Sequence, residues 1–193
     1  MTEQNLKYTV PGMSVGDARQ VIDLLQSRLN CYSDLQLTLK HVHWNVVGPH
    51  FIAVHEMIDP HVDEVRAMAD ETAERIATFG GSPQGTPGAL VAARTWQDYS
   101  VGRASTQEHL AALDIVYRGV IADTRTAITD LEQLDPVTQD VLIDHAQKLE
   151  LFHWFVRAHL EDTTGGLVTA DATEEVEAAE AVDQAADRAR AGS

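Results

Sequence analysis

The stretch that decides the fold reads HWNVVGPHFIAVHEMID and runs from His43 to Asp59. It joins two amphipathic patterns across the pair Gly48-Pro49, where a helix does not continue because proline lacks a backbone N–H and glycine favours a left-handed turn. It also places His43, His55 and Asp59 within seventeen residues. The stretch therefore predicts a turn between two helices and a candidate cluster of metal ligands.

Apolar residues on both sides of this turn recur at intervals of three and four, which is the spacing of an amphipathic helix. Ser14 stands three residues before Asp17 and predicts an N-cap with an acidic first turn. Asp135-Pro136 predicts the N-cap and first residue of a later helix. Gly80-Gly81 predicts a helix end. The four predicted helices span about residues 14–46, 52–79, 105–134 and 136–164.

The connection between the second and third helices is long and rich in glycine and proline over residues 82–88, with a short helix expected over 89–93. Four long helices with one extended middle connection predict an all-α four-helix bundle of the crossover type. We expect a flexible N-terminal leader over residues 1–13, the bundle over 14–164, and an acidic, mobile C-terminal tail over 165–193.

The net charge, the cysteine count and the hydropathy of the chain indicate which partners and cell compartments to expect. The 193 residues carry 30 acidic and 14 basic side chains, a net charge of −16, and one cysteine. Such a chain attracts cations and repels nucleic acid and anionic membrane, although simple solubility also explains the charge. A single cysteine allows no internal disulfide. No stretch has the length of a membrane span and no signal peptide is visible, so we expect a cytoplasmic protein without a membrane partner.

Imidazole and carboxylate groups are ligands for divalent metals such as iron and zinc. A second acidic group, Asp70, Glu71 and Glu74, follows on the second helix. At about 100° per residue, Asp70 and Glu74 share a helix face with His55 and Asp59. Because Asp59 and Asp70 lie eleven residues apart, they are separated by about 16 Å along the helix and cannot bind one ion together.

The two groups can meet only if the second helices of two subunits lie antiparallel about a two-fold axis, which would create two identical sites per dimer. His43, His55 and Asp59 would then come from one subunit, and Asp70 and Glu74 from the other. The alternative is that the histidines are interface residues with satisfied hydrogen bonds and the acids form a solvated face.

The stretch HWNVVGPHFIAVHEMID, followed by ADETAERIATFGG at residues 69–81, resembles the Dps family of mini-ferritins, in an actinobacterial-like form. The resemblance covers about residues 14–161. It implies a ferritin-like four-helix bundle with a short extra helix between helices two and three. It also implies a homo-oligomer, a dodecamer built from two-fold dimers that encloses a hollow cavity.

The resemblance further implies a ferroxidase with a two-iron inter-subunit centre. Its ligands would be His43, His55 and Asp59 of one subunit, with Asp70 and Glu74 of the two-fold mate. Fe²⁺ would be oxidised preferentially by hydrogen peroxide and stored as an Fe³⁺ mineral, which protects the cell from oxidative stress. The alternative is a nucleoid-associated shell that protects DNA and oxidises iron only secondarily. Trp44 is a candidate redox aromatic, or an interface aromatic with no redox role.

Acidic residues outside the central stretch could also bind or guide iron, and each has a structural alternative. Glu150 and His153 form a Glu-x-x-His pair, which larger ferritins use for in-bundle iron sites, but the second helix offers no matching pair. We expect them to serve surface or inter-subunit packing. In the family, acids near the turn between the third and fourth helices line a pore. Asp123 and Asp135 are the candidate pore residues here, and helix capping is the alternative for Asp135.

The sequence gives little support for DNA binding, because Lys and Arg residues supply affinity for phosphates. The leader offers Lys7 against Glu3, and residues 162–193 hold two arginines against eight acids. We therefore consider tail-mediated DNA binding doubtful and a nucleoid location secondary to a cytoplasmic one.

Overall fold

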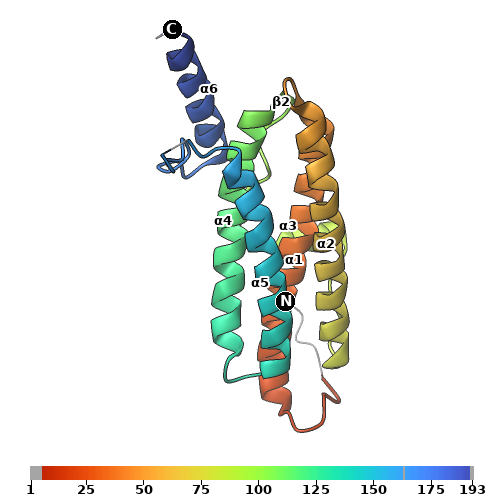
Figure 1. The fold of residues 1–193 in the computed structure, drawn as a ribbon. Helices are drawn as coiled ribbons and strands as arrows, with labels where there is room; N and C mark the ends of the chain where they lie inside the picture. The colour runs from red at the N-terminus through yellow and green to blue at the C-terminus, as the bar shows by residue number, and fades with distance from the viewer. Residues whose placement is uncertain (1–5, 163, 192–193) are drawn as a thin grey trace. The chain divides into compact units, whose positions relative to one another are not determined.

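The computed structural model describes residues 6–162 and 164–191; residues 1–5 of the predicted leader and 192–193 of the predicted tail lie outside this range. The described chain is mainly helical (Figure 1) and confirms the all-α four-helix bundle with a short extra helix. The long helices are α1 (Val15–Asn45), α2 (Phe51–Thr78), α4 (Thr106–Leu131) and α5 (Pro136–Ala158). The others are α3 (Pro87–Ala93) and α6 (Glu175–Ala191), with the strands β1 (Val46–Val47) and β2 (Ala104–Ser105).

The predicted helix starts of α1 and α5 carry side-chain caps. Ser14 Oγ accepts a hydrogen bond from the Asp17 backbone N–H at 3.0 Å and donates to the Asp17 carboxylate at 2.7 Å. Asp135 Oδ2 accepts from the backbone N–H of Thr138 at 3.1 Å. Such caps satisfy backbone donors that the first helical turn leaves without a partner.

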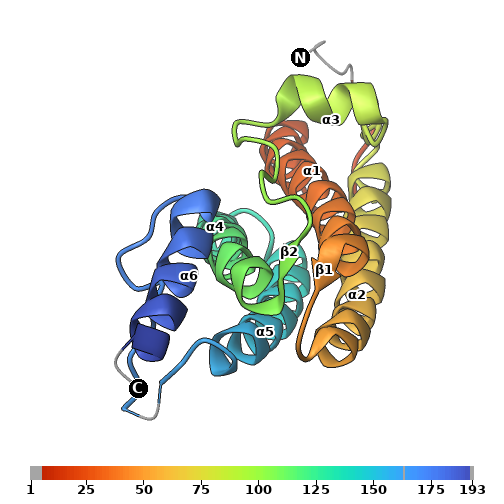
Figure 2. The same ribbon diagram turned by 90° about the horizontal axis from the view of Figure 1, so that it is seen from above.

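The break between α1 and α2 contains the strand β1, which the sequence did not predict. β1 pairs in parallel with β2, with Val46 opposite Ala104 and Val47 opposite Ser105 (Figure 2). The pairing is only two residues long, so it lies below the length that a sequence pattern can signal. It fixes the turn after α1 to the residues that precede α4.

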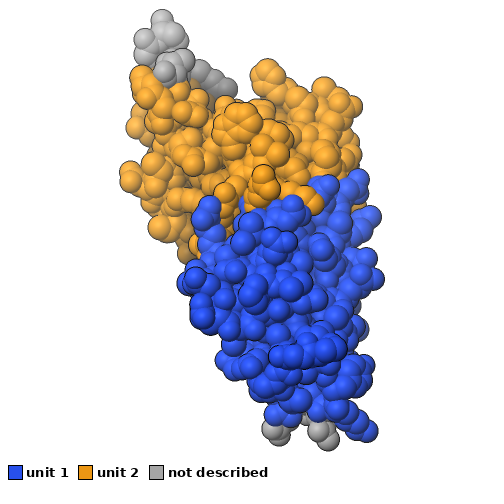
Figure 3. Space-filling view, turned by 60° about the horizontal axis from the view of Figure 1, so that its bottom comes forward, with its two compact units in different colours: residues 1–37, 62–96, 123–146 blue, residues 38–61, 97–122, 147–193 orange. Residues whose placement is uncertain are grey.

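The chain forms two compact units (Figure 3). Unit 1 comprises residues 1–37, 62–96 and 123–146, and contains α3 together with segments of the four long helices. The buried apolar side chains that these segments contribute include Leu25, Tyr32, Leu35, Val65, Met68, Ile76, Phe79, Leu131 and Leu142. Their spacing at three and four residues accounts for helix formation by burial of one face of each helix.

Unit 2 comprises residues 38–61, 97–122 and 147–193, and contains the turn between α1 and α2, the two strands and α6. Its buried apolar side chains include Leu39, Val42, Val54, Ile58, Leu110, Leu113, Tyr117, Leu149, Phe152 and Val156. All three candidate ligands of the His43–Asp59 stretch lie in this unit.

The C-terminal segment, which the composition predicts to be an acidic, mobile tail, makes contacts with the rest of unit 2. It contains α6, whose Ala178, Ala179 and Val182 are buried. Thr169 Oγ1 donates to the buried carboxylate of Asp114 at 3.1 Å. Whether the segment is mobile stays a prediction, but the structure gives it packed contacts that an Ala- and Glu-rich sequence does not reveal.

Candidate metal centre

The turn between α1 and α2 has two residues with positive φ. Gly48 has φ 93 and His50 has φ 65. The Gly48 value lies outside the range that side-chain-bearing residues adopt readily, so glycine is required there by conformation. The turn brings the last residues of α1 against the first residues of α2, and so places His43 beside His55.

The two imidazoles are held by reciprocal hydrogen bonds. His43 Nδ1 donates to the backbone carbonyl of His55 at 3.0 Å, and His55 Nδ1 donates to the carbonyl of His43 at 2.9 Å. The rings stack with centroids 3.6 Å apart and an angle of 24° between their planes. Phe51 lies against the His55 ring at 4.9 Å. Each ring is therefore fixed both by the backbone and by a neighbouring ring.

These hydrogen bonds determine the tautomer of both histidines. A carbonyl oxygen only accepts, so the proton of each neutral ring must be on Nδ1. Nε2 of each ring then carries a lone pair and has no hydrogen-bond partner in the described part of the chain. A histidine whose Nδ1–H is held by a carbonyl is the usual arrangement of a metal ligand that binds through Nε2.

Asp59 completes the group on the same helix as His55. Its Oδ1 lies 3.2 Å from His43 Nδ1 and 2.9 Å from the ammonium of Lys40. The hydrogen bond from Lys40 is the main reason that the pKa of Asp59 lies below its ordinary value. Asp59 is therefore ionised at neutral pH, with Lys40 as its cationic partner in the absence of a metal ion.

Asp70 and Glu74 also lie on α2, but in unit 1, and both side chains are exposed. Neither carboxylate forms an ion pair or hydrogen bond with any other described residue. Within residues 6–162 and 164–191, no group of three or more His, Cys, Asp or Glu side chains is arranged to hold a metal ion. Within the described residues of one chain, Asp70 and Glu74 do not join His43, His55 and Asp59 in a metal-binding group, and the site shared between subunits stays a prediction.

Trp44 is 71% exposed, with the Lys40 ammonium 6.0 Å from its ring centroid. Ile52, on the first turn of α2, is also exposed. Large apolar side chains exposed beside a candidate site are more typical of an interface than of a solvent-facing surface. This exposure favours the interface role of Trp44 and is compatible with a redox role.

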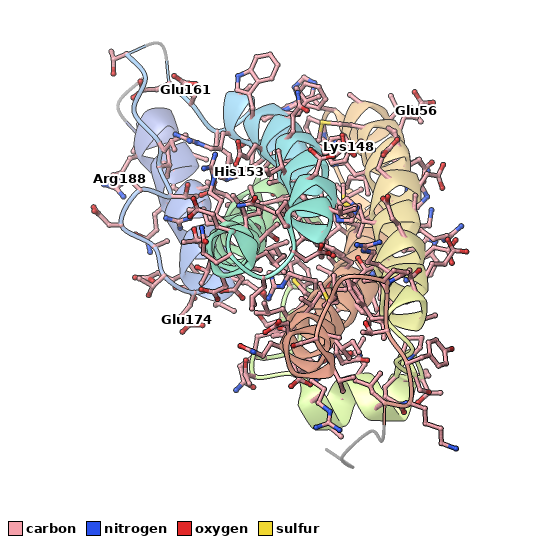
Figure 4. The ribbon with its side chains drawn as sticks, turned by 90° about the horizontal axis from the view of Figure 1, so that it is seen from below. Glu56, Lys148, His153, Glu161, Glu174 and Arg188 are labelled. Atoms are coloured by element: carbon pink, nitrogen blue, oxygen red, sulfur yellow. The ribbon has the colours of Figure 1, made fainter. Side chains whose placement is uncertain are left out.

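The Glu150–His153 pair does not form a second ligand set in the described residues. His153, labelled in Figure 4, donates from Nε2 to Oδ1 of the buried Asp114 at 2.7 Å. Burial alone would raise the pKa of Asp114, but the hydrogen bond from His153 and the charge of Arg118 outweigh it and hold the pKa below its ordinary value. His153 therefore forms a hydrogen bond to a buried carboxylate of its own chain, which differs from the surface or inter-subunit packing that the sequence predicted.

The two candidate pore residues lie in different environments. The Asp123 side chain is 62% exposed, and the guanidinium of the buried Arg28 lies 3.6 Å from it. Asp135 is buried, caps α5 and accepts a hydrogen bond from Arg75 at 2.8 Å. The structure therefore gives Asp135 a capping role, and only Asp123 presents an exposed carboxylate.

Sequence reasoning did not single out Lys40, although it lies one helical turn before His43. The pattern that could have identified Lys40 is a lysine on the same face of α1 as His43, because an aspartate ligand near that face needs a cationic partner.

None of the helices in the described residues has the length and apolar character of a membrane span.

Comparison with known proteins finds similar sequences over most of the chain. A ferritin-like domain model matches residues 22–165. The "DNA protection during starvation protein" of Mycolicibacterium smegmatis is 65% identical over 160 residues, which cover 83% of this chain and 87% of that protein.

Two solved structures are similar over most of the chain. Mycobacterium smegmatis Dps has a TM-score of 0.85 at 63% identity, covering 86% of this chain and 96% of its own. DpsA14 from Streptomyces coelicolor has a TM-score of 0.83 at 61% identity, covering 83% and 96%. The chain therefore belongs to the Dps family of ferritin-like proteins.

Proposed function

We propose that the protein is a ferroxidase and iron store whose catalytic centre forms between two subunits. Membership of the Dps family implies iron handling and DNA protection in general terms, and the specific activity rests on the site. The observation that carries it is the pair of reciprocal hydrogen bonds that leaves Nε2 of His43 and His55 free, with the Asp59 carboxylate 3.2 Å from His43 Nδ1.

The substrates are two Fe²⁺ ions and one hydrogen peroxide. Each Fe²⁺ gives up one electron, the O–O bond of the peroxide breaks, and water supplies the remaining oxygen of two ferric oxyhydroxide units with release of four protons. Both electrons are taken up by one peroxide, so no hydroxyl radical is released. Oxidation raises the positive charge at the site, which carboxylates stabilise.

Each residue has a defined part in this reaction. His43 and His55 would bind iron through Nε2, and their fixed rings reduce the freedom lost on binding. Asp59 would supply a carboxylate oxygen once Lys40 is displaced. Asp70 and Glu74 of the two-fold mate would complete the centre. Because imidazole must be neutral to bind, affinity should fall at acid pH.

The shared site requires assembly. We propose a dodecamer built from two-fold dimers, with the exposed Trp44 and Ile52 buried between subunits. The exposed Asp123 is our candidate for guiding Fe²⁺ through a pore, since a ring of like carboxylates attracts cations. A cytoplasmic location belongs to the same proposal, and a nucleoid-associated location belongs to the DNA-protecting alternative.

Kinetics of iron oxidation test the proposal. The assembled protein should consume Fe²⁺ and hydrogen peroxide at two to one, and His43→Ala and Asp70→Ala should each slow oxidation by about a hundredfold at equal assembly. Unchanged rates in both variants would remove the ferroxidase assignment.

A shell that mainly protects DNA is the second candidate, because the M. smegmatis relative carries a name of that kind. The net charge of −16 counts against direct DNA contact by this chain. Protection of DNA by removal of Fe²⁺ and peroxide, without direct DNA contact, is consistent with both the negative net charge and the proposed metal centre.

A further inference from the structure

We propose that helix α6 positions the histidine half of the metal centre, acting through residues 99–106. This inference rests on the proposed function, since it concerns the geometry of the same site. Every contact that carries it lies within unit 2. Glu175 and Ala179 are the positioning residues that it assigns.

On one side, residues 99–106 contact α6. Glu175 Oε2 accepts two hydrogen bonds from Ser100, from the backbone N–H at 2.8 Å and from the hydroxyl at 3.0 Å. Ala179 is buried in a small apolar cluster with Val101 and Ala112. Figure 2 shows α6 beside α4, with the segment leading to β2 close to both. The outward Glu174 and Arg188 side chains of the same part of the chain, labelled in Figure 4, take no part in this contact.

On the other side, the same residues contact the turn that carries the ligands. His41 Nε2 donates to the Val101 carbonyl at 2.9 Å, and His41 lies two residues before His43 on α1. The buried Thr106 donates its hydroxyl to the Pro49 carbonyl at 3.1 Å. Between these two hydrogen bonds, β2 pairs with β1. Two hydrogen bonds and one strand pairing therefore connect residues 101–106 to the segment that holds His43 against His55.

Val101 links the two sides directly. Its side chain packs with Ala179 of α6, while its carbonyl accepts from His41 of α1. A change that removes α6 from this cluster lets Val101 move and weakens its hydrogen bond to α1. Because the centre needs His43 and His55 at a fixed separation, added freedom in the turn lowers affinity for the metal ion.

This mechanism predicts a particular kinetic signature. Once an ion is bound, it holds both rings in place, so the oxidation rate at saturating Fe²⁺ should not change. A general loss of structure would instead lower both the affinity and the saturated rate, and would disturb assembly. Affinity is therefore the quantity to measure.

The test uses the full-length assembled protein and Co²⁺, which binds Fe²⁺ ligands without being oxidised by air and reports its ligands through visible absorption. Glu175→Ala removes the acceptor for Ser100. Its matched control is Glu177→Ala, because Glu177 accepts from Thr173 N–H at 2.9 Å within the C-terminal segment and does not contact residues 99–106. A second pair compares Ala179→Asp in the buried cluster with Ala186→Asp on the exposed face of α6.

We expect Glu175→Ala and Ala179→Asp to raise the Kd for Co²⁺ about fivefold, with both controls within about twofold of the wild type. Glu175→Gln, which keeps an acceptor oxygen, should restore most of the affinity. The saturated rate of Fe²⁺ oxidation should stay unchanged in all of them.

Equal Kd values for Glu175→Ala and Glu177→Ala in assembled protein would overturn the positioning role and leave the ferroxidase assignment standing. A loss of saturated rate in parallel with affinity would also overturn it, in favour of a purely structural role for α6. If the wild type bound no Co²⁺ and oxidised no Fe²⁺, the proposed function itself would fail.

Discussion

His43 and His55 each donate the Nδ1 proton to a backbone carbonyl across the turn. These two hydrogen bonds leave Nε2 of each ring available to bind a metal ion. The backbone carbonyl fixes the tautomer of each ring, and the Asp59 carboxylate also lies 3.2 Å from His43 Nδ1. The sequence predicted which residues form the group, because their spacing across Gly48-Pro49 restricts them to one turn. It did not predict the reciprocal bonds, which depend on the closing angle of the turn.

Lys40 is the residue-level feature that sequence reasoning missed. Its contact with Asp59 joins residues nineteen positions apart, and only the folded turn brings them to 2.9 Å. A metal ion that takes Asp59 must displace this ammonium. Lys40 should therefore lower the affinity for divalent ions while keeping Asp59 ionised.

We predict that Lys40→Met tightens Co²⁺ binding about twofold to fivefold, since the metal ion no longer has to displace an ammonium from an exposed ion pair. The substitution also lets the pKa of Asp59 rise toward its ordinary value of about 4, but Asp59 stays ionised at pH 7. Titration with Co²⁺ at neutral pH and low salt measures the effect. Lys7→Met, at an exposed lysine in unit 1, is the control, and weaker binding by Lys40→Met would contradict the prediction.

At the scale of elements, the four long helices and α3 follow from patterns in the sequence, because each buries one face at helical spacing. The paired strands β1 and β2 do not, since two residues carry no readable alternation. The packing of α6 was also missed. Its alanines and acids resemble a solvated helix, and their partners Val101 and Ala112 lie about seventy residues away in the chain.

The contacts of Asp135 at the start of α5 favour a helix-capping role for this residue over a role in a pore. Burial would raise the pKa of Asp135, but hydrogen bonds from Thr138 and Arg75 outweigh it and hold the pKa below its ordinary value. A carboxylate with a lowered pKa in the folded state stabilises the protein above the unfolded pKa of about 4. This contribution is lost as the pH falls through the folded value.

Asp135→Ala should therefore lower the free energy of unfolding by about 2 kcal/mol at pH 7, and by much less near pH 2. Denaturant unfolding at the two pH values measures this, with the exposed Asp140→Ala as the control. Asp123→Asn should instead slow iron uptake at low salt. If Asp135→Ala left stability at pH 7 unchanged and slowed only uptake, Asp135 would be a pore residue.

At the scale of the whole molecule, the proposed assembly would join the two incomplete clusters into shared sites and would multiply the net charge of −16 per chain. A shell with that charge repels phosphates, and the arginines near the C-terminus are outnumbered by acids. The family name implies DNA, but the chemistry of this chain does not supply the contacts.

We predict that the assembled protein does not retard plasmid DNA in a gel at submicromolar concentration, neutral pH and low salt, where electrostatic binding is strongest. It should nevertheless protect the same plasmid from cleavage by Fe²⁺ and peroxide. Retardation under these conditions, abolished by added salt, would show that a basic surface forms on assembly and would favour the DNA-protecting alternative.

The central claim is that each metal centre uses His43 of one subunit and Asp70 of another, and mixing two inactive variants tests it. In a dimer of one His43→Ala chain and one Asp70→Ala chain, one site carries both changes and the other carries neither. Random co-assembly in equal amounts should restore about a quarter of the wild-type rate of Fe²⁺ oxidation by peroxide. Mixed oligomers no more active than either parent, with co-assembly verified, would contradict a shared site.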